Sequence, residues 1–204
     1  MYLQVVRKQL EKKGETQLSQ ALGKMDQQVD KLTLLISDLL NVSRIQLGRL
    51  DFHEEPFDLE ETVKDIVESI QPTTKKHTIG LSGHIKKKIR GDKDRIGQVI
   101  TNLLTNAIKY SPDAEQIDVT LSETREEVIV EVRDYGIGID AKHMNKIFQR
   151  FYRVADSNEK TFPGLGIGLF ISQEIIARHG GQLVVESEKG QGSTFRMILP
   201  IHKK

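Results

Sequence analysis

Apolar residues recur at helical spacing near the start of the chain. Between positions 18 and 39 an apolar residue returns every three or four residues, which makes a seam about three heptads long. A shorter amphipathic segment over residues 1–13 precedes it, and Gly14 breaks the pattern between them. We therefore predict a helical hairpin over residues 1–52. The seam consists of Leu18, Leu22, Met25, Val29, Leu32, Ile36 and Leu39, widened by Leu35, Leu40 and Val42.

One hairpin cannot bury so wide an apolar face, which leaves two interpretations. Either the hairpins of two chains form a four-helix bundle, or the seam packs on the rest of its own chain. We favour a homodimer, because the hairpin is N-terminal and separable in composition from the rest of the chain.

Residues 53–204 mix helical and strand periods without a strict strand–helix–strand alternation. We expect short strands in HTIGLSGHI and KKIRG, a strand hairpin in IDVTLSE and EVIVEVRD, and a closing hairpin in QLVVESEKGQGSTFRMILPI. Asp58 with Glu61 forms a capping-box-like helix start, and Asp94 is expected to cap the next helix. AKHMNKIFQRFYRV is expected to form a further short helix. Together these features predict an α+β sandwich, a mixed and mostly antiparallel sheet covered by helices on one face.

Composition limits the function classes. The chain has 204 residues, of which 37% are hydrophobic and 29% charged, and its formal net charge is +1. Because cysteine is absent, disulfides, thiolate catalysis and cysteine zinc sites are excluded. No apolar run approaches about 18 residues, so we expect no membrane contact by this chain. The charge balance and the lack of aromatics among the basic residues argue against a nucleic-acid partner.

Two asparagines stand four residues apart in TNLLTNAIKY, a segment that otherwise reads as a helix. Asn102 and Asn106 share a polar stripe with Lys109, opposite a broad apolar face. A solvated polar face explains this segment taken alone. The alternative is the lining of a site, because amide oxygens suit Mg²⁺ and Lys109 could face a phosphate. The apolar face consists of Ile96, Ile100, Leu103, Leu104, Ala107 and Ile108.

A carboxylate stands at the end of the predicted strand VIVEVRDYGIGI. By strand parity Asp134 falls on the same face as the valines, and a carboxylate aimed at a core needs a partner because an unpaired buried charge is very costly. Gly136 and Gly138 follow at once and would let a flat ligand approach the backbone. An exocyclic amine, such as that of adenine, could donate to Asp134. The alternative is an ordinary turn at a strand end.

PGLGIGLF places three glycines, Gly164, Gly166 and Gly168, directly before an apolar helix. Backbone N–H groups at a helix N-terminus are suited to binding phosphate. The segment is neither a Rossmann fingerprint, since Leu169 occupies the third glycine position, nor a P-loop, since no Gly-Lys-[Ser/Thr] follows. The alternative is a glycine-rich loop that merely bends.

Taken in order, these motifs resemble a known family. Asn-x₃-Asn, Asp-x-Gly-x-Gly, IFQRFYRV and Gly-x-Gly-x-Gly resemble the N, G1, F and G2 boxes of sensor histidine kinases, which belong to the ATPase superfamily shared with gyrase, mismatch-repair and heat-shock chaperone ATPases. KGQGSTF resembles the closing Gly-Thr block, and MDQQVDKLTLLISDLLNVSRIQLGRL resembles the second helix of the kinases' dimerisation domain. The resemblance covers almost the whole chain, and the ordered set is far more specific than any single motif.

The resemblance implies a role for each matching residue. Asn106 would be the main Mg²⁺ ligand, supported by Asn102, and Asp134 would accept from the adenine amine while Tyr110 lies against the ring. It further implies that Lys109 and Arg153 contact the phosphates and that Gly164, Gly166 and Gly168 wrap around them. Gly136, Gly138 and Thr194 would lie beside the adenine. Residues 154–163 would form a mobile lid, which Phe148 and Phe151 would couple to the hairpin.

These roles imply an ATP-binding catalytic domain over residues 53–204. It would transfer the γ-phosphate of Mg·ATP to a histidine, from which it passes to an aspartate of a response-regulator receiver domain. The hydrolysing relatives place a glutamate where this chain has Asn102, and an amide cannot activate water as that base does. The alternatives are an ATP-hydrolysing member of the superfamily, and a nucleotide-sensing dimeric scaffold without phosphotransfer.

The chain departs from the family in one respect. None of its six histidines fits the acceptor motif of a histidine followed by an acidic residue and a threonine or asparagine. The first predicted helix begins just beyond the place where the acceptor belongs. We therefore expect a fragment whose parent carries that histidine upstream of Met1, and a cytoplasmic location whether or not the parent is anchored in a membrane.

Overall fold

The computed structural model describes residues 16–46, 52–154 and 165–201. The chain divides into two compact units, Met1–Gly48 and Arg49–Lys204. The described part of the first unit is one long helix, α2 (Thr16–Gln46). The helix expected over residues 1–13 lies outside the described residues. Along α2, Leu22 of the seam is half-buried and Val42 is buried, whereas six seam residues are each more than half exposed: Leu18, Met25, Val29, Leu32, Ile36 and Leu39.

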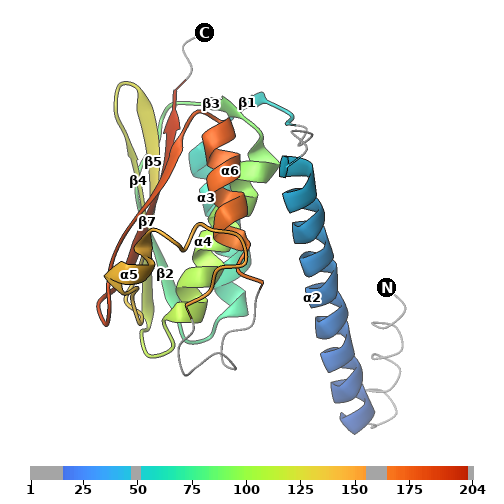
Figure 1. The fold of residues 1–204 in the computed structure, drawn as a ribbon. Coiled ribbons are helices and arrows are strands. Elements are labelled where there is room, and N and C mark those ends of the chain that lie inside the picture. Colours follow the sequence, from blue (N-terminus) through green and yellow to red (C-terminus); the bar gives the residue numbers. More distant parts are fainter. Residues whose placement is uncertain (1–15, 47–51, 155–164, 202–204) are drawn as a thin grey trace. The chain divides into compact units, whose positions relative to one another are not determined.

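The second unit is built around a five-stranded sheet with the strand order β2-β4-β5-β7-β6 (Figure 1). β2 runs parallel to β4, and the other neighbouring strands are antiparallel. Short strands β1 and β3 form a separate antiparallel pair. The strands are β1 (Glu55–Phe57), β2 (Thr78–Gly83), β3 (Ile89–Gly91), β4 (Gln116–Glu123), β5 (Glu127–Asp134), β6 (Gln182–Glu188) and β7 (Gly192–Pro200).

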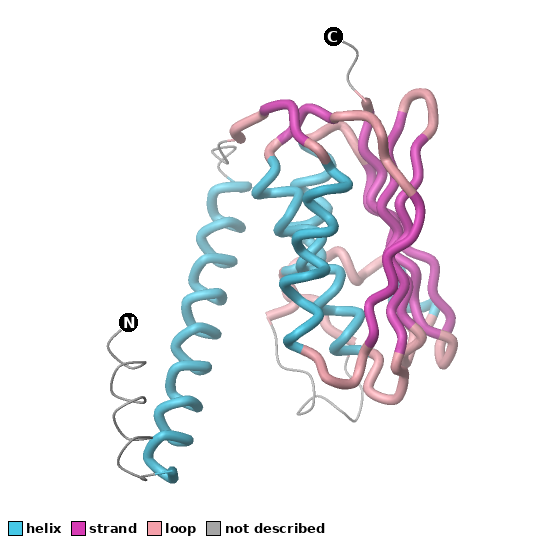
Figure 2. Tube along the Cα trace, turned by 180° about the vertical axis from the view of Figure 1, so that it is seen from behind, coloured by secondary structure: helices cyan, strands magenta, loops and turns pink. Residues whose placement is uncertain are grey.

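Three helices cover one face of this sheet, and Figure 2 shows the two layers from behind. The predicted α+β sandwich and both predicted strand hairpins, β4–β5 and β6–β7, are confirmed. The helices of the unit are α3 (Leu59–Ile70), the 3₁₀ turn η1 (Gln71–Thr73), α4 (Lys93–Tyr110), the single turn α5 (Ala141–Met144) and α6 (Gly168–Arg178).

The apolar stripe of α4 supplies much of the core. Five of its six predicted members are almost fully buried, and Ile108 is only half-buried. Across from them, the valines of β5 point into the same layer, as strand parity predicts. Each of the buried isoleucine, leucine and valine side chains contributes roughly 1.5–3 kcal/mol by leaving water. The polar residues of α4 are thereby held in a fixed rotation about the helix axis.

The start of α4 differs from the prediction. Its N-cap is Asp92, whose Oδ1 accepts from the backbone N–H of Arg95 at 3.0 Å, while Asp94 lies in the first turn. The second Asp92 oxygen accepts from the backbone N–H of His53 at 3.0 Å. β3 ends at Gly91, so the helix begins two residues earlier than a cap at Asp94 would allow. The predicted cap of α3 is confirmed, because Asp58 accepts from the Glu61 N–H at 3.0 Å.

The segment AKHMNKIFQRFYRV is not a helix throughout. α5 ends at Met144, and short-range turns follow, with Lys146 N–H donating to His143 and Gln149 N–H donating to Lys146. Phe151 then adopts a positive φ of 61°, which ends any helical path. The segment is instead anchored as a turn by Ile147, which is buried.

Candidate nucleotide-binding site

The polar stripe of α4 packs against α6, so full solvation does not explain it. Asn102 and Asn106 are both half-buried. Asn106 Nδ2 donates to Asn102 Oδ1 at 3.4 Å, and Asn102 Nδ2 donates to Ser172 Oγ on α6 at 3.0 Å. Gly168, the first residue of α6, lies so close that a Cβ there would stand 2.5 Å from Asn102 Oδ1. The N-terminus of α6 is thus brought against the two asparagines.

Asp134 is a buried carboxylate, as parity predicts, with 4% of its surface exposed. Its Oδ1 accepts from the backbone N–H of Gly136 at 2.9 Å and from the Ser111 hydroxyl at 3.3 Å, and Ser193 also donates to the carboxylate. Burial raises the pKa of Asp134, an effect that these hydrogen bonds only partly offset. The result is a positioned acceptor in a poorly solvated place, suited to an amine donor.

The glycines after Asp134 are required first by the protein itself. A Cβ on Gly136 would stand 2.0 Å from the backbone oxygen of Tyr110, at the end of α4. Gly138 has a φ of +62°, and its Cβ would stand 1.9 Å from the backbone oxygen of Glu188. The loop is therefore clamped between α4 and the β6–β7 turn. The sequence interpretation, close approach of a ligand, is not needed to explain these residues.

Ser193, the residue before Thr194, is the neighbour of Asp134 on β7. In the β5–β7 register Asp134 pairs with Ser193, while Arg133 pairs with Thr194. Paired residues share a face and alternate residues face opposite sides, so Thr194 lies on the sheet face away from Asp134. The register thus brings Ser193, and not Thr194, beside Asp134. The register, which sets this choice, cannot be read from KGQGSTF alone.

The second glycine-rich loop packs between the segment after α5 and α4. Gly166 has a φ of +70°, and a Cβ on it would stand 2.6 Å from the backbone oxygen of Tyr152 and 3.0 Å from Cγ of Arg153. Arg153 is half-buried beside this loop. Among the residues that the structure describes, no side chain caps the N-terminus of α6, and the first N–H groups of this helix have no partner within it. Gly164 and residues 155–163 of the expected lid lie outside the described residues.

The C-terminal end of α4 joins the two loops. Tyr110 accepts through its backbone oxygen from the N–H of Ile137 at 3.0 Å, within the loop after Asp134. Lys109 Nζ lies 4.7 Å from the centroid of the Tyr110 ring. Both side chains are half-buried. Phe148 is half-buried as well, whereas Phe151 is 58% exposed.

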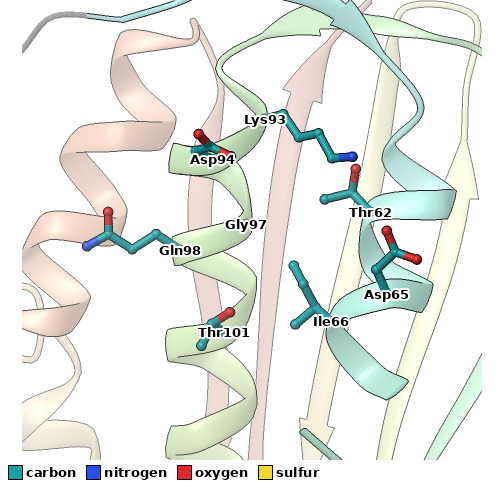
Figure 3. Close-up of a pocket in the computed structure, with 8 residues that line it drawn as sticks. All are labelled: Thr62, Asp65, Ile66, Lys93, Asp94, Gly97, Gln98 and Thr101. Carbon is teal, nitrogen blue, oxygen red and sulfur yellow. The ribbon is translucent and has the colours of Figure 1, made fainter. Parts of the chain in front are cut away.

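An open hollow of about 340 Å³ lies between α3 and α4. Figure 3 shows residues of both helices around it, with Ile66 of α3 facing Gly97 and Thr101 of α4. On a helical wheel Gly97 and Thr101 lie on the stripe of α4 next to that of Asn102 and Asn106, and Gln98, four residues before Asn102, borders both. Nothing in the described structure indicates what would fill the hollow.

The groups present fit a divalent cation and a nucleotide. Asn106 Oδ1 accepts no hydrogen bond from the described residues, and a carboxamide oxygen is a suitable ligand for Mg²⁺. Within the described ranges no cluster of three or more His, Asp or Glu side chains could hold a metal, so a cation here would keep waters or phosphate oxygens as ligands.

Among the described helices none is long and apolar enough to cross a membrane.

Comparison with known proteins agrees with this geometry. Residues 91–203 match the family described as histidine kinase-, DNA gyrase B- and HSP90-like ATPases. The sensor protein SrrB of Staphylococcus aureus is 32% identical over 188 residues, which make up 90% of this chain and 32% of SrrB. The circadian input-output histidine kinase CikA of Thermosynechococcus vestitus is 32% identical over 171 residues, 81% of this chain and 24% of CikA. The chain thus spans about a third or less of these relatives.

Solved structures show the same fold. The Acinetobacter baumannii histidine kinase AdeS superposes with a TM-score of 0.73 at 23% identity, over 90% of this chain and 85% of AdeS. Full-length ShkA in complex with AMPPNP gives a TM-score of 0.74 at 25% identity, over 93% of this chain and 39% of ShkA. The chain therefore belongs to the histidine kinase-, DNA gyrase B- and HSP90-like ATPase family, and it carries the ATP-binding domain in the form found in sensor histidine kinases.

Proposed function

We propose that this chain is the catalytic part of a sensor histidine kinase. It binds Mg·ATP and presents the γ-phosphate to a histidine on a dimerisation helix, from which the phosphate passes to an aspartate of a response-regulator receiver domain in the cytoplasm. The observation that carries the proposal is the position of α4. One end contacts the loop of the buried Asp134, and its asparagines contact the N-terminus of α6.

This arrangement gives the nucleotide two distinct ends. At one end Asp134 accepts from the adenine amine, and Tyr110 lies against the ring. Asn102 and Ser111 are about 13 Å apart along the axis of α4, a span that leaves room for the ribose and phosphates. At the other end the phosphates meet the α6 N-terminus, with Lys109 and Arg153 as cationic contacts and Gly164, Gly166 and Gly168 as the surrounding backbone.

Mg²⁺ belongs at the phosphate end in this proposal. Asn106 supplies the protein ligand through Oδ1, and the bound ion would neutralise charge on the phosphate oxygens during transfer. Catalysis by the chain's own residues is then positioning and charge neutralisation. Asn102 is engaged by Ser172 and Asn106 and, as an amide, cannot take a proton from water. Transfer to a histidine is therefore favoured over hydrolysis.

Calorimetric titration tests this proposal directly. The chain is expected to bind ADP and AMPPNP, with AMPPNP bound more tightly when Mg²⁺ is present. Asn106→Ala is expected to lose about 10-fold or more of the Mg²⁺-dependent gain and to keep the Mg²⁺-free affinity, because it removes a metal ligand and no contact with adenine. Thr105→Ala, an exposed change on the same helix, serves as the control.

Two outcomes would contradict the proposal. A folded wild-type chain that binds no adenine nucleotide is not an ATP-binding kinase domain. Steady release of phosphate from ATP, with no label passing to a histidine-bearing dimerisation helix supplied separately, would instead favour the hydrolysing members of the family.

The proposal includes a homodimer formed through the seam of α2. Six seam residues are more than half exposed, among them Leu32 at 58% and Ile36 at 53%. Leu32→Glu or Ile36→Glu is expected to shift a concentration-dependent dimer towards monomer, because each places a charge in a packed seam. Sedimentation analysis over a range of concentrations measures the shift, with the exposed Thr33→Glu of the same helix as control. A wild type that stays monomeric at all concentrations argues against this interface.

A further inference from the structure

The buried hydroxyl of Ser172 reaches the proposed site only through its hydrogen bond with Asn102. Ser172 stands one turn after Gly168 on α6 and is 2% exposed. Its Oγ accepts from Nδ2 of Asn102, which lies 70 positions earlier in the chain. Serine is a weak residue for the interior of a helix, because its hydroxyl competes for backbone hydrogen bonds. A polar group buried there must be satisfied, and Asn102 satisfies it.

Two hydrogen bonds in series lead from Ser172 to the proposed metal ligand. Ser172 Oγ accepts from Asn102 Nδ2 at 3.0 Å, and Asn102 Oδ1 accepts from Asn106 Nδ2 at 3.4 Å. The nitrogen of each amide therefore donates to the residue that precedes it in the series. The oxygen of Asn106 is left without a hydrogen bond from the described residues.

The opposite orientation of these amides would turn the Asn106 oxygen away from the cation. Without an acceptor at Ser172, the Asn102 amide could rotate by half a turn and direct its Nδ2 group at Asn106. Asn106 would then turn its own oxygen towards Asn102 and present N–H groups to a cation, which they repel. Asn102 cannot easily leave this place, because Gly168 packs directly on its amide.

We propose that Ser172 is a positioning residue of the metal site. A hydroxyl can donate as well as accept, but the N-terminus of α6 at Gly168 favours the oxygen of Asn102 over its nitrogen. Ser172 therefore accepts from Asn102 Nδ2 and holds both amides so that Asn106 Oδ1 faces the cation. It acts through Asn102 and contacts neither metal nor nucleotide. This inference rests on the proposed function, because it takes Asn106 as the Mg²⁺ ligand.

A pair of isosteric variants separates the hydroxyl from its volume. Ser172→Thr and Ser172→Val add the same bulk, but only threonine keeps an oxygen that can accept from Asn102. In calorimetric titrations with AMPPNP, Ser172→Val is expected to reduce the Mg²⁺-dependent gain in affinity about 10-fold, the range seen when a group that orients a metal ligand is removed. Ser172→Thr is expected to keep most of that gain. Affinity without Mg²⁺ should be equal in both.

Coupling to Asn106 completes the test. In the Asn106→Ala background, Ser172→Val is expected to cause no further loss, because the group through which it acts is gone. Equal losses in the threonine and valine variants, or equal losses with and without Mg²⁺, would reduce Ser172 to a packing residue and overturn the inference. Ser172→Ala removes the hydroxyl without adding volume and gives the same readout if the larger variants unfold. A wild type without Mg²⁺-dependent gain refutes the proposed function itself.

Discussion

Replacing Asp134 by asparagine is expected to weaken ATP binding about 100-fold or more, because a donor of the ligand is left facing another donor. In the proposed site the carboxylate accepts from the adenine amine while Gly136 N–H already donates to its Oδ1 at 2.9 Å. Asparagine has only one oxygen to offer. Its Nδ2 group must point either at the adenine amine or at the Gly136 N–H, and both arrangements bring two donors together.

The same change is not expected to destabilise the fold. Burial raises the pKa of Asp134, which means that the charged form is less favourable in the fold than in the unfolded chain. Because the pKa of Asp134 is raised in the fold, its protonation adds to the free energy of unfolding at a pH below the unfolded pKa. This contribution is lost as the pH rises through the folded pKa. At pH 7 the buried charge therefore lowers the free energy of unfolding. Asparagine carries no charge and so removes this cost, which offsets the loss of one acceptor oxygen for the donors at Gly136, Ser111 and Ser193, so the variant should stay folded at this pH with a stability near that of the wild type.

Calorimetry with ADP and ATP analogues measures the effect on binding. Urea unfolding at pH 7 and about pH 4 measures the effect on stability, and the lower pH lies near the unfolded pKa of aspartate. Lowering the pH should stabilise the wild type relative to the variant, because only the wild type loses the cost of the buried charge. Asp118→Asn is the matched control, because Asp118 pairs with Arg133 and so lies on the sheet face away from Asp134. An Asp134→Asn variant with wild-type affinity would mean that adenine is recognised elsewhere.

Sequence alone could predict those parts of the site that depend on local periodicity. Strand parity places Asp134 on the buried face, and the helical wheel places Asn102 and Asn106 on one stripe. Both follow from spacing within a single element. The capping residue of α4 shows the limit of such reasoning, because Asp92 and Asp94 are equally suitable until the end of β3 is known.

Contacts between distant segments could not be predicted in this way. Ser193, and not Thr194, reaches Asp134 because of the register of β7 on β5, which no local pattern specifies. Ser172 and Ser111 enter the site through the packing of α6 and the end of α4, across 70 and 23 positions of sequence. A serine in an amphipathic helix has no signal of its own that marks it as part of a site.

Gly138→Ala is expected to lower the free energy of unfolding of the ATP-binding unit by about 3 kcal/mol or more. A left-handed backbone costs a non-glycine residue roughly 1–2 kcal/mol, and Gly138 has a φ of +62°. The added Cβ would also stand 1.9 Å from the backbone oxygen of Glu188, and a backbone atom cannot move aside as a flexible side chain can. The loop and the β6–β7 turn would have to separate, which also breaks the bond from Gly190 N–H to Ile137 at 2.8 Å.

Gly97→Ala is the matched control, since it makes the same substitution in the middle of α4. Its Cβ would meet only Cδ1 of Ile66, at an ordinary contact distance of 3.5 Å. Alanine favours the helix over glycine by about 0.8–1.0 kcal/mol, so this variant should be more stable than the wild type. Urea unfolding of the three proteins gives both differences under one set of conditions.

The result also decides between two explanations of the glycines after Asp134. If Gly138 is present so that a nucleotide can approach the backbone, Gly138→Ala should weaken ATP binding and leave stability unchanged. If it is present because the loop packs on the β6–β7 turn, stability falls in the absence of any ligand. The distances to Tyr110 and Glu188 favour the second explanation for both Gly136 and Gly138. Binding would then be lost as a consequence, because the same packing holds Asp134 in place.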